Sequence, residues 1–230
     1  MTKTNTTAAE PVKIPPADLV DLNGFEGQHP VRVDVVYAKA DHPRNIFGTA
    51  IYRADAHMWA HKDMARVILK AAALCHAQSG WIFEIKDCLR TVEAQEKMRE
   101  TDIVKRNPHW LQEPNRLLSP PGLGGHPRGM AVDIVLLDKQ GHEVDMGTPF
   151  DFLSEDRANN PAARNYTHFP DAVLKNRKFL EDVMVRAGKE CGFEIYPLPQ
   201  EWWDFRFMPD YSRRFAPIHD AELPAHMRMT

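Results

Sequence analysis

The spacing of hydrophobic and polar residues along this 230-residue chain predicts a set of strands. Apolar and polar residues alternate over 31–37 (VRVDVVY), and runs rich in apolar residues occupy 81–89 and 130–138. These patterns predict strands, half-buried in the first case and more fully buried in the other two. A further strand is predicted over 193–207 (FEIYPLPQEWWDFRF), where two prolines indicate a sheet edge or a bulge.

Three other segments have the spacing of helices. Apolar residues recur three and four positions apart over 56–78, and Gly80 stands where that helix should end. Thr91 can cap a second helix that runs to residue 106, ahead of a proline that the helical backbone disfavours. The third helix is predicted over 174–192. Helices and antiparallel strands in separate blocks predict an α+β fold, in which helices flank an antiparallel sheet.

The remaining segments define the organisation of the chain. A Gln-Gly turn at 140–141 predicts a hairpin after the strand 130–138. A segment rich in proline and glycine over 107–129 is too irregular for regular structure, and long irregular connections in compact domains are usually functional. Residues 1–15 read as a flexible arm, and 16–230 as a single domain.

Composition and charge exclude several classes of partner. A net charge of −3 and a pI near 6.4 give no basic surface for nucleic acid or for a membrane. There is no apolar run of about 18 residues, and the N-terminal segment lacks the apolar stretch of a secretory signal, so we expect a cytoplasmic protein. Cys75, Cys88 and Cys191 contain no C-x-x-C pair and read as reduced thiols. The sequence leaves the oligomeric state open.

The candidate chemistry begins in the stretch PQEWWDFRF (199–207). Glu201 and Asp204 are carboxylates in apolar surroundings, where an ionised group is costly unless it meets a cation. A predicted core strand that carries two tryptophans between acidic residues is difficult to explain as a surface exposed to water. This pair is therefore the first candidate for a site.

Two more candidates lie around the strand 130–138. Asp133 interrupts an apolar strand, and a metal ion or an arginine could compensate its charge. An ordinary explanation stays open, because Asp133 could pair with Arg128 or accept a bond from a backbone amide. His126, in the loop before this strand, could equally be a loop histidine without chemistry, since the chain contains 11 histidines.

Geometry limits how these residues can act together. Residues three apart on a regular strand point to opposite faces, so Glu201 and Asp204 can meet one ion only if the chain bends near Pro199. A hydrolytic zinc site has three protein ligands, an open position for water and a carboxylate that acts as general base. His126, Asp133 and Asp204 with Glu201 match these roles in number and type.

The same residues carry a resemblance to a known family. The chain resembles the D-alanyl-D-alanine dipeptidases of the VanX type, in the zinc peptidases of family M15, over about residues 30–215. The first motif is S-x-H-x-x-G-x-A-x-D, matched by GGHPRGMAVDIVL, and the second is E-x-W-H, matched by QEWWDF. Agreement extends to three further segments: VVYAKADHPRNIFG (35–48), IKDCLR (85–90) and DMGTPFDF (145–152).

The resemblance implies a fold and a set of roles. The fold is the hedgehog-like fold of the D-Ala-D-Ala peptidases, and the cofactor is Zn²⁺. His126 and Asp133 would be zinc ligands, Glu201 the general base for the attacking water, and Arg90 the cation that polarises the scissile carbonyl. The activity implied is hydrolysis of D-Ala-D-Ala or a related D-amino-acid dipeptide, with the segments 107–125 and 150–170 as walls of the cleft.

Two departures from the family pattern affect this expectation. Asp204 stands where the family has a third histidine ligand, and Gly124 where it has a serine. One imidazole and two carboxylates would neutralise a divalent ion, which predicts a weaker or alkaline-shifted hydrolase, a harder metal, or loss of the metal. The absent serine leaves recognition of the substrate's amino terminus open.

Three functions therefore remain in view. The first is a zinc dipeptidase. The second is a metal hydrolase of the same fold that acts on another small amide or a peptidoglycan fragment. The third is a catalytically silent homologue that binds a small ligand in the old cleft.

Overall fold

A five-stranded sheet forms the centre of the protein. The computed structural model describes residues 10–113 and 116–230. The sheet order is β2-β4-β5-β7-β6, and all neighbours are antiparallel except the parallel pair β2–β4. Its strands are β2 (Val31–Val33), β4 (Ile82–Asp87), β5 (Ala131–Leu137), β7 (Asp204–Phe207) and β6 (Ile195–Pro197). A second sheet pairs β1 (Leu19–Asp21) with β3 (Trp59–His61).

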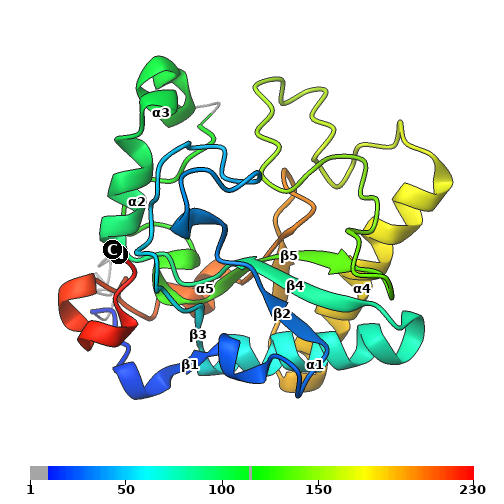
Figure 1. Cartoon of the computed structure of the whole chain (residues 1–230), viewed down its shortest axis with the longest axis horizontal. Helices are drawn as coiled ribbons and strands as arrows, with labels where there is room; N and C mark the ends of the chain where they lie inside the picture. Colours follow the sequence, from blue (N-terminus) through cyan, green and yellow to red (C-terminus); the bar gives the residue numbers. More distant parts are fainter. Residues whose placement is uncertain (1–9, 114–115) are drawn as a thin grey trace, which may run out of the picture.

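The long helices α1 and α4 cover one side of this sheet, and α2 and α3 lie away from them, among irregular segments (Figure 1). The two long helices α1 and α4 pack against each other, α1 also against β4 and α4 against β6. The helices are α1 (Lys62–Ser79), α2 (Val92–Arg99), α3 (Asp102–Arg106), α4 (Asp171–Cys191) and α5 (Pro209–Ser212). The 3-10 turns are η1 (Pro16–Asp18), η2 (Leu22–Phe25), η3 (Val36–Ala38), η4 (Pro108–Leu111), η5 (His126–Arg128), η6 (Asp220–Glu222) and η7 (Ala225–Met227). The predicted α+β class, with helices flanking a sheet, is confirmed.

The sheet register brings acidic residues together across three strands. β5 is buried along its whole length, as its apolar sequence AVDIVLL requires. Asp133 on β5 pairs with Asp87 on β4 and with Asp204 on β7. A register shift between Ile85 and Asp87 precedes the first pair. Residues directly opposite each other in a ladder share a face, so the fold itself assembles an acidic row in the interior.

The predicted strand over 193–207 is wrong as a single element. The segment forms two antiparallel strands, β6 and β7, that pair with each other through Ile195 and Phe207. Proline cannot donate a ladder hydrogen bond, and Pro197 and Pro199 stand where the first strand ends and the turn begins. The chain therefore reverses between them and Asp204.

Other element bounds differ for local reasons. The predicted helix 91–106 is broken into α2 and α3, where the Thr101 hydroxyl donates to the Met98 carbonyl oxygen at 2.8 Å. Thr91 precedes α2 but makes no side-chain cap bond. The returning strand after β5 is reduced to a single bridge between Leu137 and Glu143. Gly80 does end α1, with φ of 74° in the left-handed region.

The N-terminal segment is described only from residue 10. The prediction of a flexible arm over 1–15 therefore falls largely on residues 1–9, which lie outside the described residues. From there on, Val12 bonds through its backbone to Arg214 and Ala216, and Ile14 is buried. Over the described ranges, every helix is too short or too polar to cross a bilayer.

Candidate metal centre and active site

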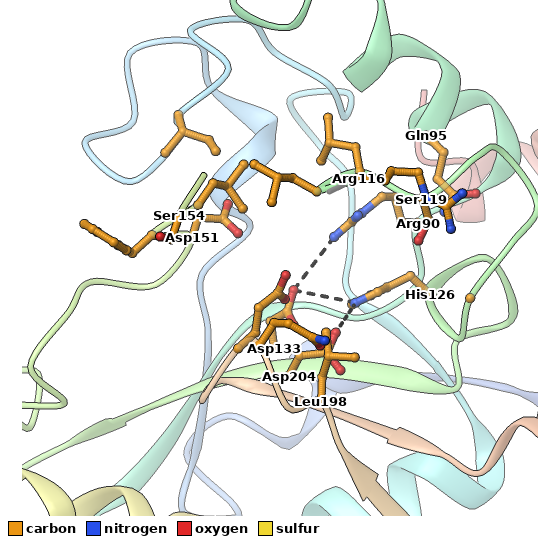
Figure 2. A pocket seen from close by; sticks show the side chains of 18 of the residues that line it. Arg90, Gln95, Arg116, Ser119, His126, Asp133, Asp151, Ser154, Leu198 and Asp204 are labelled. Carbon is orange, nitrogen blue, oxygen red and sulfur yellow. Dashed lines mark hydrogen bonds and ion pairs between the residues drawn. The ribbon is translucent and has the colours of Figure 1, made fainter. Parts of the chain in front are cut away.

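Three of the predicted site residues meet above the central strands (Figure 2). His126 Nε2 lies 3.3 Å from Asp204 Oδ2 and 3.7 Å from Asp133 Oδ2, and all three side chains are buried. His126 comes from η5, a 3-10 turn that ends at Gly129 with φ of 61°. A Cβ at Gly129 would lie 2.7 Å from the backbone nitrogen of His61, so only glycine lets the loop pack this closely.

The hydrogen bonds of His126 fix which ring nitrogen faces the carboxylates. Nδ1 lies 2.8 Å from the carbonyl oxygen of Cys88, which can only accept, so Nδ1 carries the proton. In the neutral ring, the lone pair of Nε2 then faces Asp133 and Asp204. A lone pair facing two carboxylates is repulsive unless a cation lies between them. Ligands about 2.0–2.2 Å from a tetrahedral zinc ion are about 3.3–3.6 Å apart, close to the separations found here.

Asp133 gives independent support for a cation. Its Oδ1 is buried and has no hydrogen-bond partner among the described residues. Burial, followed by the charges of Asp204 and Asp87, raises the pKa of Asp133 well above its usual range. A buried carboxylate with one unpaired oxygen, whose other oxygen lies 3.7 Å from an imidazole nitrogen, fits a divalent metal ion. His126 and Asp133 could therefore hold one together with a second carboxylate.

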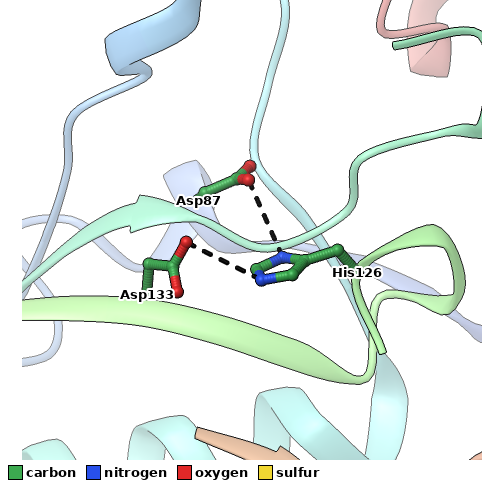
Figure 3. A group of neighbouring side chains, drawn as sticks. All are labelled: Asp87, His126 and Asp133. Atoms are coloured by element: carbon green, nitrogen blue, oxygen red, sulfur yellow. Dashed lines mark ion pairs between the residues drawn. The ribbon is translucent and has the colours of Figure 1, made fainter. Parts of the chain in front are cut away.

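Asp87 also lies within reach of His126 and Asp133 (Figure 3). Its Oδ2, however, is 3.7 Å from Nδ1, the nitrogen on the other side of the imidazole ring. Asp87 already accepts bonds from Arg90 Nε at 2.8 Å, from Arg90 Nη2 at 2.5 Å and from the Tyr52 hydroxyl at 2.6 Å. Asp87 therefore holds Arg90, and it also belongs to the group with His126 and Asp133 whose ligand atoms all lie within 4.8 Å of one another.

Arg90 reaches the cavity from the end of β4. Its Nη2 lies 3.8 Å from Asp133 Oδ2, and its side chain lines the same cavity as His126. Burial opposes its charge, but Asp87 and other neighbours raise the pKa of Arg90 well above its usual range. The guanidinium is thus a fixed, permanent cation beside the candidate metal ligands.

Glu201 lies in the turn between β6 and β7, not on a strand. Its backbone nitrogen donates to the Leu198 carbonyl oxygen at 3.2 Å, and the side chain lines the cavity with Asp204. The alternation that would turn Glu201 and Asp204 to opposite faces therefore does not apply. Burial, followed by the Asp204 charge, raises the pKa of Glu201 to about 8. A carboxylate that holds a proton near neutral pH is suited to general acid–base work.

Sequence reasoning missed Asp151, which lines the cavity on the side away from His126 (Figure 2). The Tyr37 hydroxyl donates to its carboxylate. Burial raises the pKa of Asp151 to about 7, although the Tyr37 bond and the Arg90 charge oppose the shift. Its φ of 58° is unusual for a residue with a side chain and costs free energy. Its place in DMGTPFDF was the only available signal.

Replacing Asp151 with asparagine is expected to stabilise the substrate-free protein at neutral and alkaline pH. Because its pKa is raised in the folded state, the ionised group costs stability that grows as the pH rises from about 4 to about 7. Thermal unfolding of both proteins across this range measures the effect. The gain in Tm should be smallest in acid and largest above pH 7, and a gain independent of pH would contradict the assignment.

Asp204 differs from Asp133 and Glu201 because an arginine side chain binds both of its carboxylate oxygens. Arg206 Nε donates to Asp204 Oδ1 at 2.8 Å, and Arg206 Nη2 donates to Oδ2. Burial alone would raise the pKa of Asp204, but the charge and the hydrogen bonds of Arg206 lower it far below its usual range. Asp204 is thus a permanent carboxylate. If Asp204 is a metal ligand, it must bind the metal while it is paired with Arg206.

The cavity that contains these groups has a volume of about 230 Å³. Part of its wall comes from the segments predicted to enclose the cleft. These contribute Leu117, Leu118 and Ser119 on one side and Asp151, Phe152 and Leu153 on the other. The space suits a small polar ligand.

Comparisons with known proteins identify the family of this chain. A family model described as "D-ala-D-ala dipeptidase" (Peptidase M15) matches residues 17–219. A D-alanyl-D-alanine dipeptidase of Escherichia coli (strain K12) is 28% identical over 176 residues, which cover 76% of this chain and 78% of that protein. One of Synechocystis sp. is 32% identical over 102 residues, 42% of this chain and 38% of that protein.

A solved structure described as "Crystal structure of Serratia marcescens L-Ala D-Glu endopeptidase ChiX" is 18% identical to this chain. The match covers 66% of this chain and 84% of that chain with a TM-score of 0.38.

Proposed function

Because the chain belongs to the D-Ala-D-Ala dipeptidase family of peptidases, we propose that it is a zinc-dependent dipeptidase acting on D-Ala-D-Ala or a related D-amino-acid dipeptide. The observation that carries the proposal is the convergence of His126 Nε2 with Asp133 and Asp204, next to Glu201 in one small cavity. Three ligand groups with a general base beside them are the requirements of metal-assisted hydrolysis.

The reacting groups have separable tasks. His126, Asp133 and Asp204 would hold the ion, which when bound would make water more acidic and the peptide carbonyl more electrophilic. Glu201 accepts a proton from the attacking water and passes it to the leaving amine. Arg90, fixed by Asp87, faces the oxygen on which negative charge develops.

The cavity favours a short substrate with a free amino terminus. A volume of about 230 Å³ leaves room for a dipeptide but little more. Asp151 supplies a buried carboxylate across the cavity from His126, and an ammonium group would compensate its charge. Recognition of the amino terminus would then rest on Asp151, with no need for a serine at Gly124.

Two observations bear on the rival functions. The Asp204–Arg206 pair favours a metal-free binding protein, since the arginine supplies the cation that Asp204 requires. The orphaned Oδ1 of Asp133 favours the metal, since no hydrogen-bond donor within the described ranges satisfies it. Measurement of zinc content separates the two. Hydrolysis of a panel of D,D-, L,D- and L,L-dipeptides and peptidoglycan fragments separates D-Ala-D-Ala from other substrates.

A cytoplasmic location is part of the proposal. Cys75, Cys88 and Cys191 are all free, and the first two are buried. Free thiols without disulfides are typical of a reducing compartment.

Replacing Arg90 with lysine is expected to lower kcat on D-Ala-D-Ala by about 10²–10³-fold, as loss of one oxyanion donor does elsewhere. Lysine keeps a positive charge for the buried Asp87 but cannot make the two-pronged bond that aims the guanidinium. Steady-state kinetics with zinc content as a control measures this. A full loss of zinc, or an unchanged kcat, would show that Arg90 does not act on the substrate.

A further inference from the structure

Arg206 is a cation built into the candidate ligand set. It follows Asp204 by two residues on β7, so both side chains share one face of the sheet. Nε and Nη2 each donate to one oxygen of the Asp204 carboxylate, the two-pronged arrangement in which arginine binds carboxylates best. The carboxylate is 2% exposed and the guanidinium 18%, so water screens this pair little.

Charge gives the pair its significance. His126, Asp133 and Asp204 alone would cancel the double charge of a zinc ion, and a neutral centre acidifies water poorly. The positive charge of Arg206 cancels the negative charge of Asp204 within this ion pair. The ligand set with its arginine then carries a net charge of −1, as it would with a neutral imidazole in place of Asp204.

Gly124 leaves the space that this arrangement uses. A Cβ at Gly124 would lie 3.9 Å from Arg206 Nη1 and 4.0 Å from Ser119 Oγ, so a larger side chain would extend into the space beside the guanidinium. Gly124 also has φ of 89°, which favours glycine, and its carbonyl oxygen accepts from Arg128 Nη1 at 2.9 Å. The two departures seen in the sequence, at 124 and 204, thus meet at Arg206.

We propose that Arg206 is a positioning residue that acts with Asp204 as one neutral unit, so that the aspartate orients and completes the metal site without quenching the charge of the ion. This inference rests on the proposed metal site. In this proposal, Arg206 weakens the binding of the metal and increases kcat. A merely structural arginine would not have these opposite effects.

The test is the zinc affinity of two variants, measured by competition with a chromophoric chelator. Arg206→Gln is expected to bind zinc at least about tenfold more tightly than the wild type, because a repelling charge near the ion is removed. Its kcat on D-Ala-D-Ala should fall at the same time. Arg206→Lys keeps the charge and should stay close to wild-type affinity. Arg157→Gln, at a cavity arginine without contact to Asp204, is the matched control and should leave zinc affinity unchanged.

Unchanged or weaker zinc binding in a folded Arg206→Gln protein overturns the inference. If the wild-type protein binds no zinc, the proposed function itself is wrong. Failure of the inference about Arg206 and failure of the proposed function are therefore distinguishable.

A second comparison keeps the inference testable if Arg206→Gln does not fold. Asp204→His alone would leave the guanidinium without its carboxylate next to the ion, so we expect weaker zinc binding than in the wild type. Asp204→His combined with Arg206→Gln should recover that loss. Equal zinc affinity of the single and double variants would contradict the proposal.

Discussion

Glu201→Gln is expected to lower kcat on D-Ala-D-Ala by about 10²–10⁴-fold, the usual contribution of a general base. Glutamine has the size of glutamate but cannot accept and return a proton. The pKa of Glu201, raised to about 8, shows that burial and the Asp204 charge make the proton affinity of this carboxylate unusually high. Steady-state kinetics of the purified variant, loaded with zinc, gives the measurement.

Two controls sharpen the Glu201 experiment. Zinc content and Tm of the variant should be at least as high as in the wild type, because Glu201 is not assigned to the ligands and its raised pKa means that ionising it costs the folded protein stability. Glu194→Gln changes an exposed glutamate of the same hairpin and should leave kcat unchanged. Near wild-type turnover in zinc-loaded Glu201→Gln would exclude this residue as the base.

Asp133→Asn is expected to abolish tight zinc binding and activity while raising the Tm of the metal-free protein. Asp133 is buried, its Oδ1 is unsatisfied within the described residues, and its pKa is raised well above the usual range, so its charge is costly without a cation. Asparagine fills the same volume without that charge. Thermal unfolding with and without zinc tests both effects in one experiment.

The expected pattern for Asp133→Asn is a higher Tm without zinc and little further rise on adding it. The wild type should gain Tm with zinc, because a ligand that binds only the folded state stabilises it. Asp182→Asn, at an exposed aspartate on α4, should behave like the wild type. An equal response to zinc in Asp133→Asn and wild type would remove Asp133 from the metal site.

Sequence patterns predicted the core elements better than their ends. The long helix α4 and the buried strand β5 lie close to their predicted ranges. The helix α1 ends near its predicted end but begins only at Lys62, because Trp59–His61 form the strand β3. The hairpin β6–β7 was missed because periodicity alone does not show where a chain reverses. Its two prolines were interpreted as a sign of a sheet edge or a bulge. The strand β6 does lie at the sheet edge, but the prolines also mark its end and the following turn.

The candidate site was predictable where a residue type was out of place. Asp133 in an apolar strand and Glu201 beside two tryptophans were conspicuous, and the structure brings both to the cavity with His126. Arg90 was chosen only through the family resemblance. Its partner Asp87 ends β4, a strand that also carries Glu84 and Lys86, so it did not stand out in the sequence as Asp133 did.

Pairings between distant residues could not be predicted. Asp151 acquires its environment from Tyr37, which is 114 positions away. Arg206 is near Asp204 in sequence, but a strand interrupted by two prolines gave no certainty that they share a face. The turn that frees Glu201 from the strand, and the space at Gly124, depend on tertiary packing.

The most direct test of the account is release of D-alanine from D-Ala-D-Ala by the purified protein before chelation, after chelation, and after zinc is restored. The account predicts hydrolysis that is lost with the metal, returns with one zinc per chain, and stays absent in Asp133→Asn. Wild-type protein that holds one zinc and releases no D-alanine, or that hydrolyses the dipeptide equally well without metal, would contradict it.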